Sequence, residues 1–152
     1  MNTNLAVCYL RLSKEDEKHG RIRESDSIEN QRRIIQNYAN NNNIQVIKEF
    51  IDDGISGLSA TNRPEFQKMI SFISQNPNTI ILIKDTSRFS RSQEDFIKYG
   101  KEVLKYKCDI FSVTENISYK QDRKRMELKI KIIFDEYYSQ NISEKVTSAL
   151  VA

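Results

Sequence analysis

The sequence has little of what several common kinds of catalytic site require. Its 152 residues include one histidine, His19, and two cysteines, Cys8 and Cys108. A hydrolase with a Ser-His-Asp triad would have to use His19, which lies in a charged segment, and no metal-ligand spacing of Cys and His occurs. Both cysteines stand inside apolar runs, which predicts buried free thiols of a reducing cytoplasm. We therefore expect no metal site.

Long apolar runs and a strong charge of one sign are missing as well. The sequence contains no signal peptide and no apolar stretch long enough to span a bilayer, so we expect a soluble, cytoplasmic protein without a membrane partner. Lys and Arg number 24 against 21 for Asp and Glu, an excess too small to establish nucleic-acid binding. The length is that of one ordinary domain, large enough to bury a core.

The spacing of apolar residues predicts an α/β fold with a mainly parallel sheet of four to five strands flanked by helices. Apolar runs predict strands at 4–13, 44–51, 79–84 and 108–113. Helices are expected between them because starting and stopping signals recur. Asp26 or Ser27 begins the first helix, Pro64 stands in the first turn of the second, and the third ends near Lys107. This alternation of strand and helix is typical of a parallel sheet covered by helices.

From about Lys124 the pattern changes to one long amphipathic helix. Its apolar residues recur at helical spacing, at Met126, Ile130, Ile133, Phe134, Tyr137, Ile142, Val146 and Ala149. Nothing caps this helix, so we expect the chain to be a fragment that ends inside it. We predict a compact domain at 1–123 and the start of a long interface helix at 124–152, which packs against another chain. The alternative is a helix folded onto its own sheet.

The end of the first predicted strand, residues 9–13, is the candidate for a chemical site. Side chains alternate along a strand, so Tyr9, Arg11 and Ser13 point to one side. Ligands of α/β sheets collect beyond the carboxyl ends of the strands, where Ser13 stands. A serine beside an arginine, with no histidine near, suits attack on phosphorus better than attack on a carbonyl. The plain alternative is a serine that caps a turn and an arginine in a local salt bridge.

Arginines also stand at the exits of other predicted strands. Because parallel strands share one exit edge, we expect these guanidinium groups to converge around Ser13. Their repulsion costs stability unless an anion lies between them, and the planar guanidinium matches phosphate oxygens in a bidentate way. The alternative is that each is a solvated surface charge. The arginines in question are Arg11, Arg63, Arg88 and Arg91.

Four segments together carry a resemblance to a known family. They are Tyr9-Leu-Arg-Leu-Ser13, Ser27-Ile-Glu-Asn-Gln-Arg32, Asp53-Gly-Ile-Ser-Gly57 followed by Asn62-Arg-Pro64, and Ser87-Arg-Phe-Ser-Arg91. In order and spacing the chain resembles the N-terminal catalytic domain of the serine recombinases, the superfamily of resolvases, invertases, and large serine integrases and transposases. The long loop after the first segment and the Arg-Pro pair resemble the large members more than the small resolvases.

The resemblance implies DNA strand exchange without metal, ATP or any other cofactor. Ser13 is the expected nucleophile: its Oγ attacks a backbone phosphate, expels a 3′ hydroxyl and holds the 5′ end as a phosphoserine. Gln31 and Ser56 are expected to position the phosphate or the nucleophile. The charge of the transition state is expected to be stabilised by Arg11, Arg63, Arg88 and Arg91.

Two departures from the family pattern concern acidic and basic residues. The family often has an aspartate directly before the first of the paired arginines, where this chain has Ser87; Asp85, two residues earlier, could reach the same side. In the last helix, Glu144 matches a family glutamate near the dimer contact and the active site. The basic residues that small resolvases carry just before it are replaced by uncharged ones at 139–141, so contact with DNA along this helix is expected to differ.

The resemblance also implies partners. They are DNA and other copies of the chain, as a dimer on each site and a tetramer during exchange, with no small-molecule substrate. A bacterial, phage or mobile-element origin follows from the family. This chain by itself is expected to bind DNA weakly, without sequence preference and with strong salt dependence.

Three other functions remain open from the sequence. The first is a small resolvase or invertase, and the second is a non-catalytic homologue that only binds DNA and assembles. The third is a receiver-like phosphoacceptor module, because Asp52 and Asp53 follow one predicted strand and Lys84 ends another. Receivers, however, place their acidic pair after the first strand, where this chain has Arg11 and Ser13.

Overall fold

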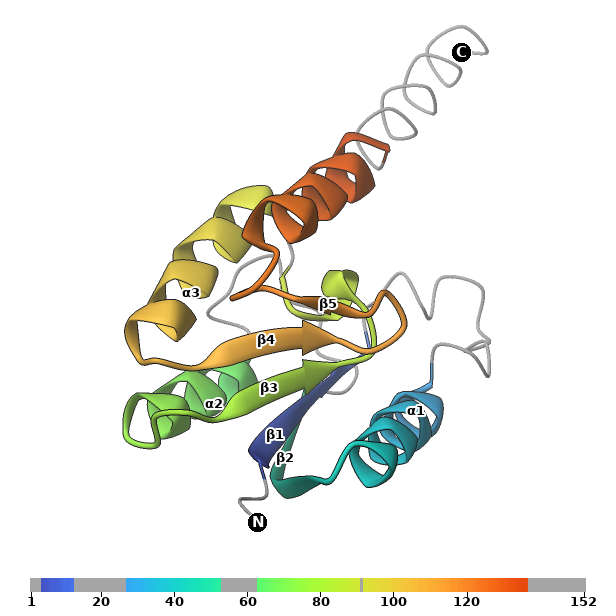
Figure 1. Cartoon of the computed structure of the whole chain (residues 1–152). Helices are drawn as coiled ribbons and strands as arrows, with labels where there is room; N and C mark the ends of the chain where they lie inside the picture. The colour runs from blue at the N-terminus through green and yellow to red at the C-terminus, as the bar shows by residue number, and fades with distance from the viewer. Residues whose placement is uncertain (1–3, 13–26, 53–62, 91, 137–152) are drawn as a thin grey trace, which may run out of the picture.

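The computed structural model describes residues 4–12, 27–52, 63–90 and 92–136. One sheet is formed by β1 (Asn4–Arg11), β2 (Ile44–Asp52), β3 (Ile80–Ile83), β4 (Asp109–Ser112) and β5 (Ile117–Ser118). The strand order is β2-β1-β3-β4-β5 (Figure 1). The first four strands run parallel, and β5 pairs with β4 in the antiparallel direction. The predicted α/β fold with a mainly parallel sheet is therefore confirmed.

Helices connect the parallel strands and cover both faces of the sheet. They are α1 (Ile28–Asn41), α2 (Pro64–Ser74) and α3 (Gln93–Lys105), and a short 3-10 turn, η4 (Thr86–Arg88), follows β3. Residues 123–136 are also helical. The core beneath α1 is separate from the core beneath α2 and α3, because these helices lie on opposite faces (Figure 1). The sequence predicted the three connecting helices, whereas η4 and β5 are too short to produce a periodic pattern.

The ends of α1 form for the reasons that the sequence indicated. Ser27 is the N-cap, and its side chain accepts a hydrogen bond from the Asn30 amide at 3.0 Å. Such a cap stabilises a helix by about 1 kcal/mol. The helix ends in the run of asparagines, where Asn43 adopts a φ of 54°, a left-handed conformation that asparagine tolerates better than most residues. Ile35 and Ala39 are buried against the sheet.

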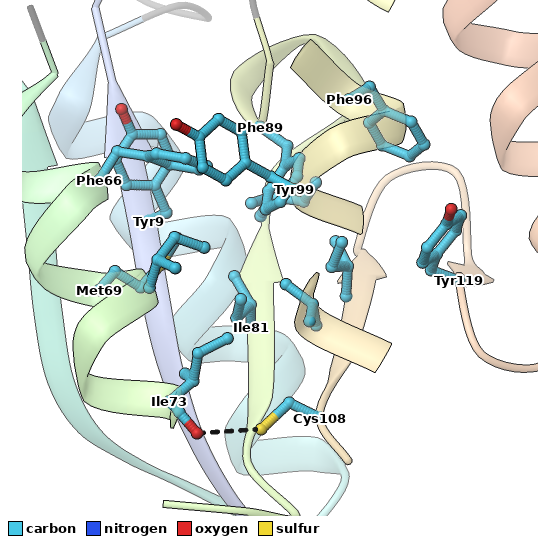
Figure 2. Close-up of a cluster of buried hydrophobic side chains, with 14 of the residues drawn as sticks. Tyr9, Phe66, Met69, Ile73, Ile81, Phe89, Phe96, Tyr99, Cys108 and Tyr119 are labelled. Carbon is cyan, nitrogen blue, oxygen red and sulfur yellow. Dashed lines mark hydrogen bonds between the residues drawn. The ribbon is translucent and has the colours of Figure 1, made fainter. Parts of the chain in front are cut away.

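Side chains of β1 alternate between the two cores, as predicted. Val7 and Tyr9 lie with the side chains of α2 and α3, while Cys8 and Leu10 lie with those of α1. Both cysteines are buried free thiols, also as predicted. Burial is the main reason that the pKa of Cys8 is raised to about 12, with the Glu49 carboxylate adding to it. The Cys108 thiol points at the Ile73 carbonyl oxygen, 3.7 Å away (Figure 2).

A row of aromatic rings crosses the larger core and leads towards the last helix (Figure 2). The rings meet edge to face, at centroid distances of 5.3 Å for Tyr9 and Phe66, 5.2 Å for Phe66 and Phe89, 5.7 Å for Phe89 and Phe96, and 5.3 Å for Phe96 and Tyr119. Each such pair contributes about 0.5–1.5 kcal/mol beyond the area that it buries. Phe89 directly follows η4, so this row fixes the chain at the end of that turn.

The helix at 123–136 begins against its own domain. Met126 and Ile130 are fully buried in the larger core, which therefore includes residues on both sides of position 123. Leu128 and Ile132 are 55% and 48% exposed and face away from that core. The first turns thus pack against their own domain on one side, while the later members of the predicted stripe, from Tyr137 on, lie outside the described residues.

Tyr119 attaches the start of this helix to α3. Its hydroxyl donates to Glu127 at 3.0 Å, and a Cβ at Gly100 would lie only 2.9 Å from its ring, so α3 needs glycine there. Burial, with the Glu127 contact, raises the pKa of Tyr119 to about 12. Among the described residues, no helix combines the length and apolar character needed to span a membrane.

Candidate active site

The short turn η4 organises the carboxyl edge of the sheet. It forms because Asp85, at its N-cap, accepts hydrogen bonds from the Ser87 amide at 3.0 Å and from the Ser87 hydroxyl. Thr86 and Arg88 are both buried. Asp85, expected among the residues that position the reacting groups, therefore holds the turn itself. The carbonyl groups that follow are the acceptors for two arginines.

Arg11 and Arg88 hold each other's backbone. Arg11, the last residue of β1, donates from Nη2 to the Ser87 carbonyl oxygen at 2.5 Å and from Nε to that of Arg88 at 3.3 Å. In return, Arg88 Nη1 donates to the Arg11 carbonyl oxygen at 3.1 Å. Hydrogen bonds from a charged donor are about twice as strong as neutral ones, so this reciprocal contact joins the exit of β1 to the exit of β3.

Gln31 fixes the backbone of Arg11 from the other side. Its side-chain oxygen accepts from the Arg11 amide at 3.2 Å, and its side-chain nitrogen donates to the Arg11 carbonyl oxygen at 3.0 Å. Gln31 is completely buried and projects from the first turns of α1. The sequence predicted that Gln31 positions the phosphate or the nucleophile, and the group that it contacts here is the backbone of Arg11.

Arg63, expected to stabilise the phosphate, is buried inside the protein in this structure. Its guanidinium is 2% exposed and pairs with Asp95 Oδ2 at 2.7 Å. Nη1 donates to the Phe89 carbonyl oxygen at 2.7 Å, and the guanidinium carbon lies 3.9 Å from the centre of the Phe66 ring. Arg63 thus supports the residue that follows η4 from inside the protein, facing away from solvent.

Asp95 is a partner that sequence reasoning missed. It stands in the first turn of α3, three residues after the N-cap Ser92, whose hydroxyl accepts from the Asp95 amide at 3.0 Å. An acidic residue at this position is explained locally by the helix dipole, so nothing in the sequence pointed to Arg63. Its carboxylate makes the buried position of that arginine possible.

Asp52 performs a similar internal role at the exit of β2. Its carboxylate accepts from the Tyr9 hydroxyl at 2.7 Å and from the amides of Glu65 and Phe66, both at 3.1 Å. It therefore caps the beginning of α2. Burial raises the pKa of Tyr9 well above its usual range; the Arg63 guanidinium offsets part of this rise and Asp52 adds to it, so the hydroxyl remains a donor. Three donors already occupy this carboxylate, unlike the metal-binding aspartates of a receiver.

The remaining predicted site residues lie outside the described part of the chain. They are Ser13, Ser56, Arg91 and Glu144. The structure does describe Leu12, which precedes Ser13, and the two serines that flank Arg91. The Leu12 amide donates to the Asp52 carbonyl oxygen at 3.1 Å. Within the described ranges, Arg11 and Arg63 thus donate to carbonyl groups of residues 87–89, and Arg88, which belongs to this turn, donates to the Arg11 carbonyl oxygen.

Fold and site define an α/β catalytic domain with arginines clustered at the carboxyl edge of its sheet. The family model for the resolvase N-terminal domain matches residues 6–152, so this chain belongs to the resolvase family, the serine recombinases. A search of curated proteins found no match.

Solved structures agree with this assignment. The N-terminal catalytic domain of TP901-1 integrase is 27% identical, with a TM-score of 0.65 over 90% of this chain and 97% of that one. A resolvase family site-specific recombinase from Streptococcus pneumoniae is 21% identical, with a TM-score of 0.65 over 95% and 97%. The catalytic domain of ISC1926 TnpA, an IS607-like serine recombinase, is 22% identical, with a TM-score of 0.57 over 72% and 70%. At such identities the last two support the fold alone.

Proposed function

We propose that this domain cleaves and rejoins DNA through a 5′-phosphoserine intermediate formed on Ser13, during integration, excision or transposition of a mobile element. The observation that carries the proposal is the reciprocal contact of Arg11 and Arg88, which gathers positive charge at the exit of β1. Ser13 follows that exit by two residues in the sequence. Membership of the resolvase family supports the same reaction.

The proposed reaction is a phosphoryl transfer in two balanced steps. The Ser13 hydroxyl loses its proton and its oxygen bonds to phosphorus as the bond to the 3′ oxygen breaks; the departing 3′ oxygen takes up one proton. In the second step a 3′ hydroxyl loses its proton and attacks the phosphoserine, and the released serine oxygen takes up one proton. Because the ester retains the energy of the phosphodiester, rejoining requires neither ATP nor metal.

The arginines supply the electrostatic part of this mechanism. Charge accumulates on the phosphoryl oxygens in the transition state, and guanidinium groups whose orientation is fixed beforehand stabilise it most. Carbonyl groups of η4 fix Arg11, and Gln31 fixes the strand that carries it. We assign Arg11, Arg88 and Arg91 to direct stabilisation of the phosphate, with positive charge also favouring the alkoxide of Ser13.

We assign a different role to Arg63 and Asp85. Arg63 faces Asp95 and Asp85 caps η4, so both maintain the turn on which Arg11 rests. Ser56 and Glu144 keep the roles that the resemblance implies, near the phosphate and at the subunit contact respectively.

A role of the integrase or transposase type fits this chain better than that of a small resolvase. The identity of 27% to the TP901-1 integrase catalytic domain supports it, together with the long segment after Ser13. We further propose that the protein acts on DNA as a dimer that pairs into a tetramer, as the family does.

The decisive experiment traps the intermediate on a nicked suicide substrate with the intact protein. The wild type should give a covalent protein–DNA adduct whose phosphoserine maps to Ser13 by peptide mass spectrometry. Ser13→Ala should abolish the adduct, while Ser71→Ala, which removes an exposed hydroxyl of α2, should not. An adduct that survives Ser13→Ala would exclude the proposed nucleophile. Absence of any wild-type adduct, with DNA still bound, would favour the non-catalytic homologue.

A further inference from the structure

The turn η4 has a second support that the sequence did not indicate. Glu115 lies in the connection between β4 and β5. Its Oε1 accepts from the Thr86 amide at 2.8 Å and from the Ser112 hydroxyl at 2.6 Å. Its Oε2 lies 3.4 Å from the Thr86 hydroxyl, which donates to it.

These contacts form an internal polar network. Thr86 and Ser112 are completely buried, and the side chain of Glu115 is 16% exposed. A carboxylate with so little exposure makes strong hydrogen bonds, because little water competes for its oxygens. The hydroxyl of Ser112, at the end of β4, fixes the carboxylate, and the carboxylate fixes Thr86, the first residue of η4.

From Thr86 the connection to the site is short. The next two residues provide the carbonyl groups that accept from the Arg11 guanidinium, and the second of them is Arg88. A displacement of Thr86 therefore moves both acceptors of Arg11 and the backbone of Arg88 together. Asp85 caps the same turn by bonding to Ser87, so Glu115 is the group that holds its first residue.

We propose that Glu115 is a positioning residue for strand exchange, acting through Thr86 on Arg11 and Arg88. This inference rests on the function proposed above. Glu115 is expected to make no contact with DNA; it keeps the arginine-bearing turn in the geometry that the reaction needs.

The same carboxylate connects the turn to the last helix. Lys129 Nζ lies 3.7 Å from Glu115 Oε2, on the helix at 123–136 whose Leu128 and Ile132 are exposed. The Lys129 side chain is 42% exposed, so this ion pair is weak by itself. The pair matters because of where it lies: a movement of this helix would displace the Glu115 carboxylate, which holds Thr86.

The test compares Glu115→Ala, Glu115→Gln and wild type by two measurements. The first is hydrogen exchange of the Thr86 amide without DNA, and the second is the rate of adduct formation at saturating DNA. Glu115→Ala should speed the exchange at least tenfold and slow adduct formation by about ten- to a hundredfold, with DNA affinity unchanged. Glu115→Gln keeps an acceptor for Thr86 and should recover most of the rate. The matched control is Glu102→Ala, which removes a carboxylate in the last turn of α3 and should change neither measurement.

Slow hydrogen exchange of core amides such as that of Ile81 shows whether Glu115→Ala is folded. If this variant does not fold, the same two measurements are made on Glu115→Gln and on Lys129→Glu, which places a second negative charge beside Glu115. Unchanged Thr86 exchange, or an unchanged rate in folded Glu115→Ala, overturns the positioning role alone. A wild type that forms no adduct overturns the proposed function and this role with it, even where Thr86 exchange responds as expected.

Discussion

Two arginines that follow neighbouring strands of the sheet, Arg11 and Arg63, differ in their exposure and in their partners. At the exit of β1, Arg11 rests on backbone carbonyl groups of η4 and remains partly exposed. Beyond the exit of β2, Arg63 is 2% exposed and paired with Asp95. Both guanidinium groups donate to backbone carbonyl groups at this turn, and that of Arg63 is also paired with the Asp95 carboxylate.

The difference suggests separate roles for the arginines of one cluster, some in stability and others in catalysis. A guanidinium neutralised inside the protein contributes to stability, because removing it leaves a buried carboxylate without a partner. A partly exposed guanidinium whose direction is fixed by backbone carbonyl groups can meet a phosphoryl transition state without reorganising. We therefore expect stability and catalysis to separate between the two exits.

The largest effect is expected when the internal pair is broken. Arg63→Ala should lower the free energy of unfolding by about 3–5 kcal/mol, the usual cost of an unpaired buried charge. Chemical denaturation monitored by circular dichroism measures this. Arg32→Ala is the matched control, because its pair with Glu49 is partly exposed and should contribute about 1 kcal/mol or less. A loss for Arg63→Ala no greater than that of the control would remove the distinction between the exits.

The next effect is on rate at the exit of β1. Arg11→Ala should slow adduct formation about a hundredfold or more, since it removes a fixed donor to the transition state. Its effect on unfolding should remain within about 1–3 kcal/mol, the range for hydrogen bonds to a charged group. Arg11→Lys keeps the charge without the planar fork and should fall between wild type and Arg11→Ala. A rate for Arg11→Ala close to that of the wild type would assign Arg11 to structure alone.

Tyr9 sharpens the comparison because it shares a strand with Arg11 but bonds to Asp52. Tyr9→Phe should cost about 1–2 kcal/mol of stability, since one acceptor site of a buried carboxylate is left empty, and should leave the adduct rate nearly unchanged. Burial raises the pKa of Tyr9, so its contribution is complete below the ordinary tyrosine pKa of 10.0 and is lost as pH rises above it. Unfolding measured between neutral and alkaline pH should therefore show a steeper alkaline loss in wild type than in Tyr9→Phe; equal slopes would contradict this.

The elements around both exits were predictable from local signals. Ser27 as a cap, Pro64 in a first turn and the alternation along β1 each depend on residues a few positions apart. The division of roles was not predictable, because it depends on pairs distant in sequence. Arg63 meets Asp95 across 32 positions, and Arg11 meets Ser87 across 76. Periodicity and caps contain no information on such contacts, and η4, three residues long, leaves no pattern at all.

The smallest expected effect is on the salt dependence of DNA binding. Each phosphate neutralised by a cation contributes about 0.9 to the slope of log K against log salt concentration, so losing one contact lowers that slope by about 1. Arg11→Ala should show this decrease on a duplex of arbitrary sequence, followed by fluorescence anisotropy. The double variant Arg63→Met with Asp95→Leu replaces the buried pair by apolar groups, which keeps such a site folded, and should leave the slope unchanged. If both variants lower the slope equally, Arg63 leaves Asp95 when DNA binds, and the two exits act on the phosphate alike.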